Sequence, residues 1–74
     1  MIKVYINTSF LEHVLAKQNL SNNAFAREIG ISSAYMSQIM THERSVGPKI
    51  RQRIMDYFGL KIAAWDLLFE MDDK

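Results

Sequence analysis

The residues from Ser33 to Thr41 include the side chains best suited to recognising another molecule. On a helix, successive residues turn by about 100°, so Ala34, Gln38 and Thr41 project to one side. Ser37 lies beside them, and the opposite side is apolar. A small, polar face of this kind lets a helix enter the major groove of DNA, where the Gln38 amide can pair with N6 and N7 of adenine.

Neighbouring positions extend this candidate surface. Ala34 can meet a thymine methyl group, and Ser33 can reach a base edge or a phosphate. For Tyr35, packing against the core and a hydroxyl contact to phosphate are equally good interpretations. Arg44 and Lys49 follow the helix and are candidates for electrostatic contacts with phosphates, although a solvated helix face is the alternative.

The distribution of charge along the chain favours a nucleic-acid partner, whereas the net charge by itself does not. The net charge is only +1. Residues 1–60 carry seven basic and four acidic side chains, a net +3, whereas residues 61–74 carry two and four, a net −2. Four of the basic groups fall within Arg44–Arg53, directly after the candidate recognition helix, where a phosphate-binding patch would be useful.

The sequence does not predict catalysis or cofactor binding. His13 and His42 are 29 positions apart, and neither has a cysteine or a paired acidic motif around it. The absence of cysteine excludes disulfides and thiolate metal sites. Asp72 and Asp73 form an acidic pair without a histidine cluster, so we expect neither a metal, nor another cofactor, nor enzyme activity.

The recognition helix needs a partner helix, and residues 21–41 are typical of two short helices joined by a tight turn. Ser21 and Ser32 are suited to begin the two helices. Gly30 falls where the first helix ends, since glycine reaches the left-handed conformation at little steric cost. Ala26 is expected where the two backbones approach, so a larger side chain there would separate them. The apolar seam between the helices comprises Phe25, Ile29, Ile31, Met36 and Ile39.

The remaining elements follow from periodicity and end signals. Alternating apolar residues predict a strand over 2–6. Thr8 or Ser9 caps a helix that ends near Asn19, with Ser9 and Glu12 matching a capping box. Residues 42–47 are expected to form a loop, and Pro48 opens a helix that Gly59 ends.

The C-terminal part of the chain is predicted to return to the N-terminal strand. A short helix over 62–67 places Trp65 inward. The following tail, residues 67–71, fits either a last helical turn or a strand. We favour a strand paired with residues 2–6, because a lone N-terminal strand would leave its backbone groups unpaired.

Length and composition predict one domain over residues 1–74. Its 74 residues lie near the lower size limit for a core without staples. No apolar run is long enough to span a bilayer, and no signal peptide opens the chain. We therefore expect a soluble, cytoplasmic protein.

Parts of this pattern resemble the Cro and phage-repressor family, often called the XRE family. The similar residues lie within about positions 10–60 and comprise Leu20-Ser21, Phe25-Ala26, Ile29-Gly30-Ile31-Ser32 and Ala34-Tyr35-Met36-Ser37-Gln38-Ile39. The resemblance implies an all-α, five-helix, lambda-repressor-like helix-turn-helix domain. The small two-stranded sheet predicted above would join the N- and C-terminal ends of this domain. The resemblance further implies base contacts by Ser33, Ala34 and Gln38, and a phosphate contact by Asn22. Where the family commonly has an acidic residue and then a glycine, this chain has Met40-Thr41-His42.

The resemblance predicts a sequence-specific regulator that binds a double-stranded DNA operator, namely a repressor of the phage or mobile-element kind. Two alternatives remain open: an antitoxin that binds a toxin and regulates its own operon, and a protein-interaction module that has lost DNA binding. A toxin or an antirepressor is thus a candidate protein partner. We expect a homodimer on DNA, formed chiefly by the apolar segment 61–71, which includes Trp65, Leu67, Leu68, Phe69 and Met71.

Overall fold

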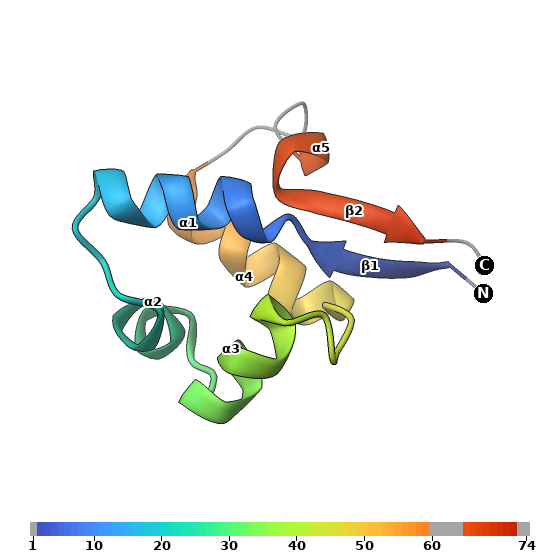
Figure 1. Ribbon diagram of the computed structural model, residues 1–74, viewed down its shortest axis with the longest axis horizontal. Helices are drawn as coiled ribbons and strands as arrows, with labels where there is room; N and C mark the ends of the chain where they lie inside the picture. Colours follow the sequence, from blue (N-terminus) through green and yellow to red (C-terminus); the bar gives the residue numbers. More distant parts are fainter. Residues whose placement is uncertain (1, 60–64, 73–74) are drawn as a thin grey trace.

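The computed structural model describes residues 2–59 and 65–72 and contains five helices and one small sheet (Figure 1). The elements in chain order are β1 (Lys3–Ile6), α1 (Thr8–Lys17), α2 (Asn22–Ile29), α3 (Ser33–Met40), α4 (Pro48–Phe58), α5 (Trp65–Leu68) and β2 (Phe69–Asp72). This arrangement confirms the predicted helical domain with a two-stranded sheet.

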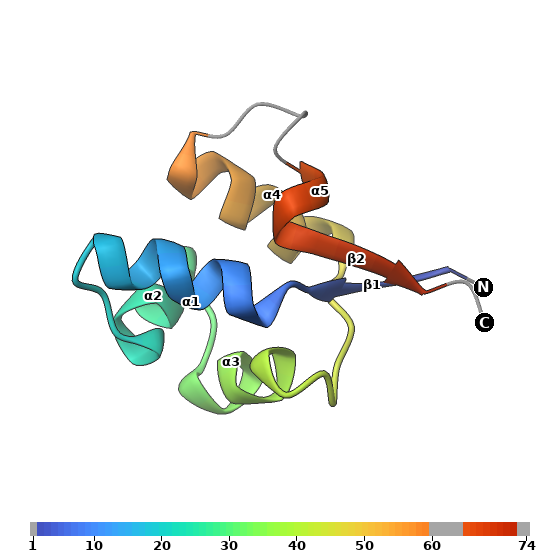
Figure 2. The same cartoon turned by 45° about the horizontal axis from the view of Figure 1, so that its top comes forward.

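Strands β1 and β2 pair antiparallel, from Lys3 opposite Asp72 to Ile6 opposite Phe69. The two strands extend together to one side of the helices (Figures 1 and 2). The prediction that the tail is a strand is therefore confirmed. The strand begins at Phe69 rather than at residue 67, because the chain is still helical through Leu68.

The ends of α2 and the start of α3 lie where the sequence places them. The Ser21 hydroxyl accepts a hydrogen bond from the backbone N–H of Ala24, and Ser32 accepts one from Tyr35, each at 3.1 Å. Gly30 has a φ of 77°, in the left-handed region. Both cap predictions and the glycine prediction are confirmed.

The predicted start of α1 is wrong, whereas its predicted end near Asn19 is confirmed. Asn7, and neither Thr8 nor Ser9, caps the helix, because its side-chain oxygen accepts a hydrogen bond from the backbone N–H of Phe10 at 3.2 Å. The helix ends at Lys17, and Asn19 then has a φ of 56°, which turns the chain out of the helix. Helix α5 includes Trp65, but residues 62–64 of its predicted range lie outside the described residues.

The core draws side chains from every element. Its buried members are Val4, Ile6, Leu11, Leu15, Phe25, Ala26, Ile29, Met36, Ile39, Val46, Ile54, Leu68 and Phe69. Among the described residues, no polar or charged side chain is buried. Leu68 and Phe69 are 0% and 2% exposed, so their expected place on a dimer surface is wrong. Trp65 is half-buried against the core, which confirms its inward position.

Candidate nucleic-acid interface

Helix α3 presents a small, polar face to solvent. Ser33, Ala34 and Ser37 are exposed, whereas Met36 and Ile39 are each only 1% exposed. Helices α2 and α3 lie at one side of the molecule, away from α5 and β2 (Figure 1). The fold thus leaves the outer face of α3 accessible to a large partner.

Gln38 does not stand alone on this face. Nε of Arg44 donates a hydrogen bond to Oε1 of Gln38, and Cζ of Arg44 lies 5.3 Å from the centre of the Tyr35 ring. Tyr35 and Gln38 are half-buried, and Arg44 is exposed. The Tyr35 ring therefore carries a cation above it, a contact that the sequence analysis did not anticipate.

The turn after α3 brings Arg44 back over the helix. The backbone N–H groups of Glu43 and Arg44 both donate to the carbonyl oxygen of Gln38, at 2.9 and 3.2 Å. A separation of six residues is not a neighbour spacing on a helix. Only this non-helical turn makes Gln38 and Arg44 adjacent.

His42 occupies the backbone conformation that makes the turn possible. Its φ is 64°, in the left-handed region that is uncommon for residues other than glycine. Nε2 of His42 lies 2.7 Å from the carbonyl oxygen of Ile6, so this nitrogen carries the proton and donates it. The His42 ring also lies 5.3 Å from the ring of Tyr5. These contacts hold a histidine in a backbone conformation that glycine adopts at less steric cost.

Thr41 is exposed, as expected, but its hydroxyl is engaged with the helix. Oγ1 lies 3.1 Å from the carbonyl oxygen of Ser37 and 3.3 Å from that of Gln38, and it donates to them. The hydroxyl therefore satisfies carbonyl groups at the C-terminal end of α3.

Asn22 and Lys49 both lie in the first turn of a helix. Asn22 is the first residue of α2, directly after the Ser21 cap, and Lys49 is the second residue of α4. Both side chains are exposed. Both side chains therefore remain accessible from solvent at the start of a helix.

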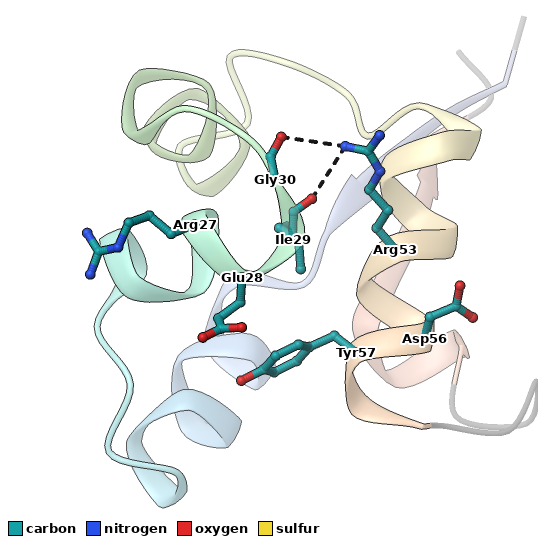
Figure 3. A pocket seen from close by; sticks show the side chains of 7 residues that line it. All are labelled: Arg27, Glu28, Ile29, Gly30, Arg53, Asp56 and Tyr57. Carbon is teal, nitrogen blue, oxygen red and sulfur yellow. Dashed lines mark hydrogen bonds between the residues drawn. The ribbon is translucent and has the colours of Figure 1, made fainter.

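Arg51 and Arg53, the other two arginines within residues 44–53, donate hydrogen bonds to backbone carbonyl oxygens. Nη1 of Arg51 donates to the Val46 carbonyl at 2.9 Å. Nη1 of Arg53 lies 3.4 Å from the carbonyl oxygen of Ile29 and 3.5 Å from that of Gly30. Figure 3 shows Arg53 reaching from α4 to the end of α2. Arg53 therefore links α4 to the end of α2, and Arg51 links α4 to the loop that precedes it, roles that charge counting does not reveal.

Two other kinds of site are absent from the described part of the chain. No group of three or more histidine, cysteine, aspartate or glutamate residues there is arranged to hold a metal ion. No helix in residues 2–59 and 65–72 is long and apolar enough to cross a membrane.

The comparisons with known proteins agree with this architecture. No protein-family model matches the chain, and no solved structure matches it. A curated protein of Bacillus subtilis (strain 168), described as "Uncharacterized HTH-type transcriptional regulator YvzC", is 30% identical over 59 residues. The match covers 80% of this chain and 77% of that protein. The chain belongs to the family of helix-turn-helix (HTH-type) transcriptional regulators.

Proposed function

We propose that this chain is a sequence-specific regulator of the Cro and phage-repressor (XRE) type, which binds double-stranded DNA and reads its major groove with α3. The observation that carries the proposal is the exposed polar face of a capped helix whose apolar face is buried against the core. Repression fits best, because occupying an operator requires no further surface. The proposed protein is a repressor of the phage or mobile-element kind that acts in the cytoplasm and has no enzymatic activity.

The proposed contacts divide into base readers and phosphate binders. Ser33, Ala34 and Gln38 meet base edges, and Ser37 and Thr41 lie beside them on α3. Three further side chains hold phosphates and so position the helix: Asn22, Tyr35 and Lys49. Contacts of the first kind carry specificity, and contacts of the second kind carry affinity for any sequence.

Gln38→Ala should weaken binding to the best operator by about 1–3 kcal/mol and leave binding to random DNA nearly unchanged. Lys49→Ala is the matched control. It should weaken both kinds of binding and lower the slope of log K against log salt by about 0.9, the value for one lost phosphate contact. Titration of labelled duplexes at several salt concentrations measures both effects.

Equal losses by Gln38→Ala on the operator and on random DNA would remove Gln38 from the base readers. An unchanged salt slope for Lys49→Ala would remove Lys49 from the interface. Binding of the parent chain that is equally tight on all duplexes would contradict the proposed function itself.

The proposal includes a homodimer on DNA. One small module buries only about 600–1,000 Å² against DNA, which seldom suffices for operator affinity. Three large apolar side chains of the described residues are exposed at the sheet and α5: Ile2 at 60%, Leu67 at 54% and Met71 at 64%. A second copy that packs against them would place two α3 helices about 34 Å apart on a palindromic operator.

Sedimentation with a full palindromic operator should therefore show two chains per duplex. Replacing Leu67 and Met71 together by serine should weaken the binding of the second chain without lowering the melting temperature, because both side chains are exposed. A complex of one chain per full palindrome would reject the dimer. A dimer unaffected by the double replacement would reject this surface.

A further inference from the structure

We infer that Arg44 and Gln38 act together as a hydrogen-bond donor group for a guanine in the major groove. The inference rests on the proposed function and deepens it, since it names the base that the operator presents to this part of α3. It also replaces the phosphate contact that the sequence analysis expects for Arg44.

The oxygen of the Gln38 amide is already engaged in a hydrogen bond. Pairing with adenine in bidentate fashion requires Oε1 to accept from N6 while Nε2 donates to N7. In the structure, Oε1 already accepts a hydrogen bond from the charged guanidinium of Arg44. The positive charge beside Oε1 opposes the approach of a second donor, so the amide offers a base mainly its Nε2–H groups.

The Arg44 guanidinium retains several N–H donors for a partner. A guanidinium has five N–H donors and no acceptor. Nε is used on Gln38, so the four N–H groups of Nη1 and Nη2 remain for a partner. The Tyr35 ring, 5.3 Å from Cζ, limits the positions of the guanidinium before DNA binds.

The four bases differ in the acceptors that they present to this donor group in the major groove. In the major groove guanine shows two acceptors, N7 and O6, whereas adenine and thymine show one acceptor each and cytosine shows a donor. Two adjacent side chains that offer mainly donors therefore match guanine best. A phosphate would also accept these bonds, but such a contact would not depend on the base.

The test starts with selection of binding sites from a random double-stranded library by the full chain. Each guanine of the selected site is then replaced by 7-deazaguanine, which lacks the N7 acceptor, and Kd is measured at fixed salt. One replacement should weaken binding of the parent about five- to fiftyfold, and the same replacement should change binding of Arg44→Ala less than about twofold. Tyr35→Phe loses the proposed phosphate contact and should weaken binding to every duplex, but it retains the ring, so the factor lost on 7-deazaguanine replacement should equal that of the parent.

Three outcomes would overturn the inference. If the parent selects a defined site but no 7-deazaguanine effect depends on Arg44, the pair does not read guanine, and the proposed function stands. If Arg44→Ala weakens all duplexes equally and lowers the salt slope by about 0.9, Arg44 binds a phosphate. If the parent selects no sequence, the proposed function fails and the inference fails with it. Thermal unfolding of each variant confirms that it is folded.

Discussion

Replacing Leu68 by alanine should lower the free energy of unfolding by about 2–5 kcal/mol. The Leu68 side chain is 0% exposed and belongs to the core cluster, so its removal leaves a cavity. A chain of 74 residues is expected to have about 4–11 kcal/mol of stability in total. The variant should therefore be partly or wholly unfolded at physiological temperature.

Leu67→Ala is the matched control for this experiment. Leu67 precedes Leu68 in α5 and is 54% exposed, so its truncation should change stability by less than about 0.5 kcal/mol. Urea unfolding followed by the fluorescence of Trp65 measures both variants. That side chain is half-buried, and its ring lies 5.1 Å from the ring of Phe69. Equal unfolding midpoints for the two variants would contradict the inward position of Leu68.

Ala26→Leu should destabilise the protein by about 1–3 kcal/mol. Ala26 is 1% exposed within α2, among core residues of α2 and α3, where the packed interior has no room for three more carbon atoms. Repacking would separate the two helices, so DNA binding should also weaken in the fraction that remains folded.

Ala16→Leu serves as the control, because Ala16 lies in α1 and is exposed. This change should move stability by no more than about 0.5 kcal/mol. Thermal unfolding by circular dichroism distinguishes the two variants. A melting temperature of Ala26→Leu equal to that of the parent would show that Ala26 is not at a close helix contact.

Local sequence signals predicted α2, α3 and α4 because their ends depend on neighbouring residues. A serine caps a helix by accepting a hydrogen bond from the backbone N–H three residues later, and a glycine ends a helix by adopting the left-handed conformation. Both effects act within about one turn of the chain. The same local rule does not decide where α1 starts. Asn7, Thr8 and Ser9 are three consecutive residues that can each cap a helix. The choice is linked to a distant contact, since the Thr8 hydroxyl donates to the Met40 carbonyl at 2.8 Å.

Contacts between distant residues were beyond the sequence analysis. Gln38 is half-buried on α3, and its hydrogen bond with Arg44 depends on the turn at His42. Likewise, an apolar run such as Leu67 to Phe69 shows that some side chains are buried without showing which. The packing of α5 and β2 on the core decides that Leu68 and Phe69 turn inward.

The first strand is fastened to the end of the proposed reading helix at several points. The carbonyl of Ile6 accepts from His42, and the carbonyl of Val4 accepts from the backbone N–H of Val46 at 2.6 Å. These two contacts link β1 to the turn that follows α3, and the Thr8–Met40 bond links the start of α1 to the end of α3. These contacts fix where the sheet lies relative to the end of α3. In a dimer held at the sheet, these contacts would fix the distance between the two α3 helices. The spacing between half-sites would then be set by the protein rather than by the DNA.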